Sequence, residues 1–164
     1  MRLAAVLLTA LSAAAAAAAS PATPPAAAAA PADGWRADRG VRFEFPARFQ
    51  VERTPEQEPG EENDVVFVGK KGALELRAEV EQGTLACTAQ ALAGAPRQLE
   101  VGGRPACEVE LPAPPVLDPK AGARRAHALL VQFPGRFLSV LAFAPDQATA
   151  SKLARQLAAT AREE

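Results

Sequence analysis

The sequence has 164 residues, with 18 lysines and arginines against 19 aspartates and glutamates, and a formal net charge of −1. A chain of this size holds one hydrophobic core, and its near-neutral balance excludes the basic surface by which proteins bind nucleic acid or an anionic membrane. The single histidine, His127, has no second histidine or CxxC pair at ligand spacing, so no metal site and no cofactor are indicated.

The first 19 residues have the pattern of a secretory signal peptide. Arg2 is the positive n-region, residues 3–11 are apolar, and the alanines at 17–19 fit the small-residue rule for cleavage before Ser20. The apolar run is near the lower limit for a membrane span, so cleavage is favoured over an uncleaved anchor, and no cysteine at the cleavage site indicates a lipoprotein. Alanine runs and an excess of arginine over lysine are typical of a GC-rich bacterium. We therefore expect a periplasmic or secreted protein with no stable membrane span after cleavage.

Residues 20–34 are rich in alanine and proline and have almost no large apolar side chains. Such a segment cannot bury enough surface to offset the entropy of ordering, so it is expected to be a flexible or polyproline-like linker. Residues 35–164 then form a single domain. Trp35, at its start, is expected to anchor the linker to the domain, and an exposed indole that binds a partner is the alternative.

Alternating apolar and polar residues predict strands in the first half of the domain. Residues 41–45 and 49–52 form two short pieces, and a loop of prolines and acids follows over 54–64. Residues 65–68 and 73–81 form a hairpin around a turn at 69–72. The second of these strands alternates regularly, with apolar side chains on one face and charged side chains on the other. We therefore expect one of its faces to be exposed to solvent.

A short helix is predicted over residues 85–95, with Thr84 as its N-cap and a glycine and a proline at its end. Residues 98–101 and 104–111 then flank Gly102-Gly103, a tight hairpin signal. On the second strand Cys107, Val109 and Leu111 share a face that is expected to point inward, while Glu108 and Glu110 are expected to face solvent.

Two more strands are predicted over 124–133 and 136–143, and a final helix begins at Pro145-Asp146, with Leu153, Leu157 and Ala161 along one side. The strand of 136–143 is apolar enough to be central. The order of elements predicts an α+β fold: an antiparallel β-sheet with a short mid-chain helix and a C-terminal helix packed on it.

The two cysteines, Cys87 and Cys107, are expected to form a disulfide, because cysteines usually pair in an oxidising compartment. The bond would close a loop of about 20 residues, worth roughly 3 kcal/mol of unfolding free energy. Free thiols remain an alternative, as does a catalytic cysteine that uses His127 as its base. On a helix that starts at Thr84, Cys87 lies about 200° from Leu85 and off the apolar stripe. Either this helix starts later or the partner strand covers its flank.

The stretch GVRFEFPARFQV resembles the G-x-x-F-x-Y/F-P-x-x-F/W opening of PsbP-like domains, matched here by Gly40, Phe43, Phe45, Pro46 and Phe49. A helix from Thr84, a Gly-x-x-Ala turn at Gly103 and Ala106, and a last strand and helix over 137–162 also fit. These α/β/α proteins include the photosystem II extrinsic subunit, a Ran-binding import factor and small exported bacterial proteins. The resemblance covers residues 40–164 and implies a non-catalytic role, as a protein that binds other proteins or as an accessory subunit. This chain lacks the charged surface of the Ran-binding relative.

One candidate binding surface combines an acidic stretch with the densest basic spot of the chain. Its residues are Glu56, Glu58, Glu61, Glu62, Asp64, Arg124 and Arg125. The acidic residues lack the ligand spacing of a calcium loop, so a solvated loop is favoured over a cation site. The loops 54–64 and 112–123 are the expected variable binding surfaces, because loops on a rigid sheet commonly carry such roles.

Three functions stay open, and the preferred one is an exported, non-catalytic protein that binds an envelope protein partner. A small periplasmic hydrolase would depend on His127 or on the acidic loop, and Ser139 has no base nearby in the sequence. A carrier would hold a small apolar ligand between the sheet and the final helix, whose alanines leave room. The partner and the oligomeric state are not specified by the sequence.

Overall fold

The computed structural model describes residues 34–55, 65–88, 95–111 and 124–164. The predicted signal peptide and linker, the acidic residues of 56–64, the later part of the mid-chain helix and the loop 112–123 lie outside these residues. The described elements are, in chain order, β1 (Trp35–Asp38), β2 (Val41–Glu44), β3 (Gln50–Pro55), β4 (Val65–Lys71), β5 (Leu74–Gln82), β6 (Arg97–Val101), β7 (Arg104–Leu111), β8 (Arg125–Phe133), β9 (Arg136–Ala144), α1 (Gln147–Ala158) and β10 (Arg162–Glu163).

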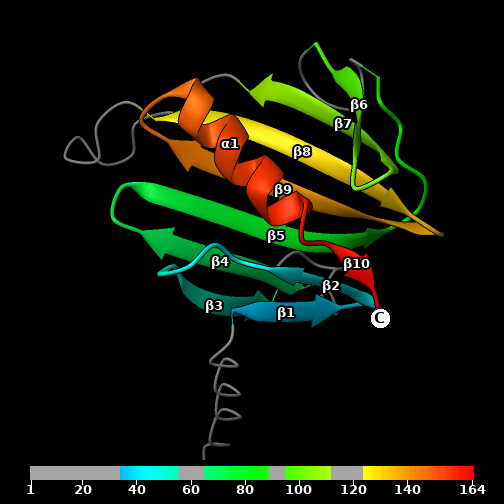
Figure 1. Ribbon diagram of the computed structural model, residues 1–164, viewed down its shortest axis with the longest axis horizontal. Coiled ribbons are helices and arrows are strands. Elements are labelled where there is room, and N and C mark those ends of the chain that lie inside the picture. Colours follow the sequence, from blue (N-terminus) through cyan, green and yellow to red (C-terminus); the bar gives the residue numbers. More distant parts are fainter. Residues whose placement is uncertain (1–33, 56–64, 89–94, 112–123) are drawn as a thin grey trace, which may run out of the picture.

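The strands form two antiparallel sheets. The large sheet has the order β3-β4-β5-β9-β8-β7-β6, and the small sheet has the order β1-β2-β10. Figure 1 shows α1 lying across β8 and β9, with the small sheet beside β4 and β5. Both cover the same face of the large sheet, because their buried side chains join one hydrophobic cluster with it. The α+β class is confirmed.

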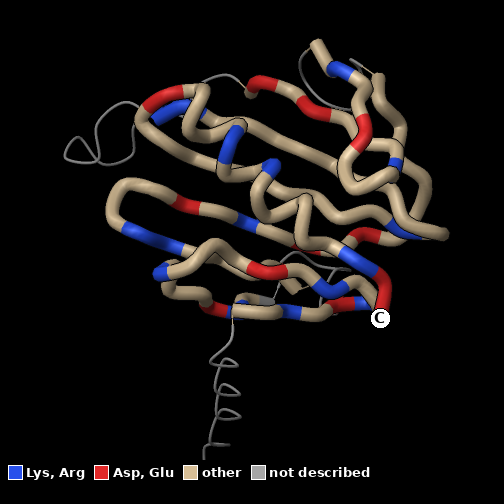
Figure 2. The backbone as a smooth tube through the Cα atoms, in the orientation of Figure 1, with Lys and Arg blue, Asp and Glu red and all other residues tan. Residues whose placement is uncertain are grey.

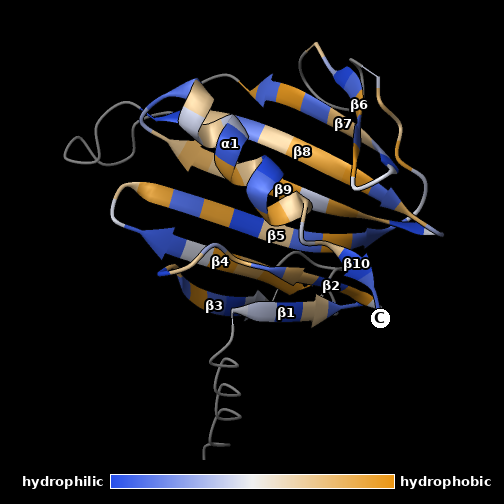
Figure 3. Ribbon diagram, in the orientation of Figure 1, coloured by the Kyte–Doolittle hydropathy of each residue, from blue (hydrophilic) through white to orange (hydrophobic). Residues whose placement is uncertain are grey.

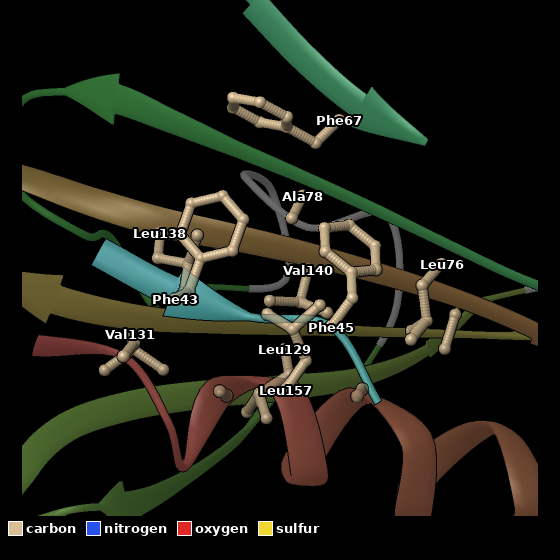
Figure 4. Close-up of a cluster of buried hydrophobic side chains, with 14 of the residues drawn as sticks. Phe43, Phe45, Phe67, Leu76, Ala78, Leu129, Val131, Leu138, Val140 and Leu157 are labelled. Carbon is tan, nitrogen blue, oxygen red and sulfur yellow. The ribbon is translucent and has the colours of Figure 1, made fainter. Parts of the chain in front are cut away.

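The core of this covered face is built from alternate residues of the large sheet and from aromatic side chains of the small one. Phe43 of β2 is fully buried, and its ring centroid lies 5.6 Å from that of Phe67 on β4. Figure 4 shows these rings among the aliphatic side chains of β5, β8 and β9. Phe45 lies so close to β4 that a Cβ on Gly69 would come within 2.6 Å of its ring. Glycine at this position therefore allows the two sheets to meet.

The helix α1 is set by its cap and by its small residues. Asp146 accepts a hydrogen bond from the backbone N–H of Thr149 at 2.8 Å, which is the usual N-cap arrangement. The buried face of the helix alternates alanine with leucine: Ala150, Leu153, Ala154, Leu157 and Ala158. These alanines are at most 2% exposed, so their small side chains let the helix pack closely against the sheet. The burial of these alanines favours close packing of the helix over the predicted carrier site between the sheet and the helix.

The predicted hairpins are confirmed, with corrections at their ends. β4 continues through Gly69 to Lys71, which pairs with Leu74, so the turn lies two residues later than expected. β3 runs to Pro55, inside the predicted loop, because it pairs along β4 as far as Val65. The strands β1 and β10 were not predicted, and α1 ends at Ala158 rather than continuing past residue 161.

The start of the mid-chain helix was predicted wrongly. Residues 84–88 carry no helical turn, and residues 89–94 lie outside the described part of the chain. Among all the residues that the structure describes, no helix is both long and apolar enough to cross a membrane.

Candidate binding site on the open face of the sheet

The face of the large sheet that points away from α1 and the small sheet has a distinct composition. On β5 this face has charged residues, which alternate with the buried apolar ones, as Figures 2 and 3 show. On β9 the residues of this face are half-buried, and three of the four are large and apolar: Phe137, Ser139, Leu141 and Phe143. Apolar side chains on both faces of β9 explain why the strand reads as central from its sequence.

A groove of about 490 Å³ lies on this open face. The floor of the groove comes from β7, β8 and β9, and its wall comes from the segment after β5. The floor is lined by Val109, Leu111, Ala128, Leu130, Phe137, Ser139 and Leu141. The wall is lined by Thr84, Leu85 and Ala86, and Glu81 lies at the border of the groove. Small-molecule sites commonly have volumes of roughly 300–1,000 Å³ and mostly apolar linings with few polar groups. The groove has the size and lining of such a site.

The wall, residues 83–88, is fixed by contacts with the sheet rather than by regular secondary structure. The N–H of Gly83 donates to the carbonyl of Gly135 at 2.9 Å, and the N–H of Leu85 donates to Oε1 of Gln132 on β8. The Sγ atoms of Cys87 and Cys107 lie 2.03 Å apart, at the distance of a disulfide bond. This bond joins the wall to β7, next to the floor of the groove.

The side chains of β7 point differently from the expectation. Cys107 is fully buried, but on the groove face, where it pairs with Leu130. Glu108 points the other way, beneath α1, and is 5% exposed, so its predicted solvent exposure is wrong. Glu110, on the same face as Glu108, is exposed as expected. The alternation along the strand was correct, but β7 is covered on both faces over part of its length.

Glu108 is the centre of a buried ionic cluster. Its carboxylate accepts hydrogen bonds from Nε of Arg97 at 2.7 Å and from Nη2 of Arg155 at 2.7 Å. Burial acts to raise the pKa of Glu108, but the hydrogen bonds from Arg155 and Arg97 outweigh it and hold the pKa below its ordinary value.

His127 belongs to the same cluster and is 3% exposed. Its Nδ1 lies 3.0 Å from Nε2 of Gln147, and its Nε2 lies 3.5 Å from Oε2 of Glu108. Burial lowers the pKa of His127, and the charge of Glu108 opposes this only in part. The ring is enclosed between β7, β8 and α1, so it packs in the fold instead of facing a substrate.

Ser139 and His127 lie on opposite faces of the sheet. Ser139 lines the groove and pairs with Leu130, whereas His127 points toward α1. A pair of serine and histidine that acts on one substrate is therefore not assembled. Among the described residues, no three histidine, cysteine, aspartate or glutamate side chains are placed to hold a metal ion.

Of the candidate binding surface, only the two arginines are described, and the structure separates them. The guanidinium of Arg124 lies 5.0 Å from the ring centroid of Phe143, on the open face, and forms an ion pair with Glu75 at 3.4 Å. Arg125 is exposed and pairs with Ala144, whose side chain belongs to the covered face. Arg77 joins Arg124, with its guanidinium 5.4 Å from the Phe143 centroid.

Trp35 lies within the domain, on β1. The guanidinium groups of Arg42 and Arg162 lie 4.3 Å and 4.4 Å from its ring centroid, so the indole contacts both β2 and β10. These cation–π contacts stabilise the small sheet. The attachment of the linker at this point stays a prediction.

Two solved structures share the fold. A protein from Bacteroides thetaiotaomicron VPI-5482 superposes with a TM-score of 0.51 at 10% identity, over 76% of this chain, which spans 45% of the length of that protein. The cyanobacterial PsbP (CyanoP) of Synechocystis sp. PCC 6803 superposes with a TM-score of 0.50 at 13% identity, over 79% of this chain and 91% of its own. No protein-family model and no curated protein matches the sequence. The chain therefore has a PsbP-like fold, as the motif at residues 40–49 suggested.

Proposed function

We propose that this chain is an exported, non-catalytic binding protein that holds an apolar ligand in the groove on the open face of its large sheet. The groove itself carries the proposal. It is apolar, it has the volume of a small-molecule site, and one of its walls is joined to the sheet by the bond between Cys87 and Cys107. A wall fixed in this way keeps the groove formed before a ligand arrives, which lowers the entropy that binding costs.

A binding role is supported over catalysis by the places of the reactive side chains. His127 is enclosed in the ionic cluster beneath α1, and Ser139 faces the groove from the other side of the sheet. An acid–base group must reach the proton that it transfers, so the imidazole is not available to a ligand in the groove.

Export is supported by the signal-peptide pattern of residues 1–19 and by the cysteine pair, since disulfides persist mainly in oxidising compartments. Cleavage before Ser20 would leave the Ala/Pro-rich linker 20–34 ahead of the domain that starts at Trp35.

The second candidate is an accessory protein whose protein partner covers the same face. The PsbP-like fold favours it, because one structural neighbour is the cyanobacterial PsbP. In that case the apolar floor would receive side chains of the partner, and a small apolar molecule would not bind with comparable affinity.

The test is a titration of the folded, oxidised protein with the neutral apolar dye N-phenyl-1-naphthylamine. Ser139→Trp fills the floor of the groove, and Ser151→Trp on the outer side of α1 is the matched control. We expect the dye to fluoresce with the unmodified protein and with S151W, but not with S139W, while circular dichroism shows both variants folded. If the dye binds none of the three, the groove is not a ligand site. Recovery of a stoichiometric protein from the cell envelope would then support the accessory role.

A further inference from the structure

The register of β5 against β9 places charges along one border of the groove. Four pairs of opposed residues lie on the open face, and in each pair the residue of β5 is charged. These pairs are Glu81 with Phe137, Glu79 with Ser139, Arg77 with Leu141 and Glu75 with Phe143. Directly opposed side chains in an antiparallel pair have Cβ atoms about 5 Å apart. Arg77 therefore lies next to Leu141, a residue of the groove floor, and the border changes sign between Glu79 and Arg77.

Two guanidinium groups gather at this end of the groove. Those of Arg77 and Arg124 lie 5.4 Å and 5.0 Å from the ring centroid of Phe143, and both bond to the carboxylate of Glu75. Within the described residues, Glu75 is the one carboxylate bonded to Arg77, and it uses only Nε, at 2.8 Å. The Arg77 side chain is 51% exposed, so its terminal nitrogens can be reached by a ligand.

These charges have a consequence for the ligand. Two guanidinium groups share the one carboxylate of Glu75, and Lys70 of β4 lies opposite Glu75 in the strand register, so positive groups outnumber carboxylates at the Phe143 end. The planar fork of arginine matches the two oxygens of a carboxylate.

On the basis of the proposed function, we infer that the ligand is a single-chain amphiphile with a carboxylate head. The head binds Arg77 and Arg124 next to Phe143, and the apolar chain lies along the floor toward Phe137 and the wall residue Leu85.

The experiment compares dodecanoate with dodecanol, both below their aggregation concentrations, as competitors of the neutral dye at pH 8. We expect dodecanoate to bind the unmodified protein about tenfold more tightly than dodecanol, since a charge-assisted hydrogen bond to a half-exposed arginine contributes on the order of 1–2 kcal/mol. The double variant Arg77→Gln, Arg124→Gln is expected to lose this preference and to keep its affinity for dodecanol and for the dye.

Arg125→Gln is the matched control, because Arg125 points to the covered face, and it is expected to keep the preference for dodecanoate. Equal affinity for the acid and the alcohol, or a preference that survives in the double variant, would overturn the carboxylate assignment while the groove remains a ligand site. Tighter binding of dodecyl phosphate than of dodecanoate would also overturn it. Failure of dye, acid and alcohol alike would refute the proposed function itself.

Discussion

Glu108→Gln removes one charge from the centre of the ionic cluster and hardly changes the volume of the side chain. In the folded protein the Glu108 carboxylate is 5% exposed and accepts hydrogen bonds from Arg97 and Arg155. A glutamine keeps one acceptor oxygen there, but its amide N–H groups face two guanidinium groups that can only donate. We expect E108Q to lower the free energy of unfolding.

The magnitude follows from the exposure of the two arginines. A hydrogen bond to a charged group contributes about 1.5–3 kcal/mol, so two arginines set an upper range of roughly 3–6 kcal/mol. The Arg97 side chain is 69% exposed and that of Arg155 is 45% exposed, so water screens both ion pairs. Water also solvates the guanidinium groups when the pairs are lost. We expect a loss of about 2–3 kcal/mol.

Urea unfolding of the oxidised protein at pH 7 measures this loss. Glu110→Gln is the control, because Glu110 lies two residues further along β7, points to the same face and is exposed. We expect E110Q to change the free energy of unfolding by less than about 0.5 kcal/mol. If E108Q loses no more than E110Q, the Glu108 carboxylate does not bind Arg97 and Arg155 in a desolvated site beneath α1, and the reasoning fails.

Three further changes test other parts of the fold. Because burial lowers the pKa of His127, the folded protein keeps the ring neutral while the unfolded chain binds a proton below about pH 6.5. The free energy of unfolding should therefore fall as the pH decreases from 6.5 toward the folded pKa, and H127N should flatten this part of a urea-derived stability profile; an unchanged slope would contradict the assignment. Replacing both Cys87 and Cys107 by alanine should lower the free energy of unfolding, measured in urea, by about 3 kcal/mol, because the disulfide closes a loop with a sequence separation of 20. A loss below about 1 kcal/mol would show that the disulfide hardly constrains the unfolded chain. Gly69→Ala should lower the free energy of unfolding by roughly 1–3 kcal/mol, because the new Cβ would lie 2.6 Å from two ring carbons of Phe45. Phe45→Leu should relieve part of this loss in the double variant. If calorimetry shows that the effects of the two substitutions are strictly additive, the contact between positions 69 and 45 is contradicted.

Much of the fold was predictable from local pattern. The hairpins of β4–β5, β6–β7 and β8–β9 have alternating residues and glycine turns, and α1 has an aspartate cap before an apolar stripe. β10 has two residues, and it is a strand only because Arg162 pairs with Arg42, far away in the sequence. So short a segment has no period of its own, which is why this strand was missed.

The segment 84–88 shows how long-range contacts override local propensity. Thr84 and the residues after it read as a helix start, but the N–H of Leu85 bonds to the side chain of Gln132, and Cys87 is joined to Cys107. These partners hold the segment against the open face, where it forms a wall instead of a helical turn.

The sequence by itself determined the α+β class, the hairpins, the C-terminal helix and the alternation of Cys107 and Glu108 on β7, because these depend on residues close together in the chain. Only the tertiary structure decided what covers each face. Both α1 and the small sheet lie on one face, so Glu108 and His127 become buried and the apolar residues of β9 on the other face form a groove. Alternation states which side chains share a face, but burial depends on what packs against that face, and this is set by contacts between distant segments.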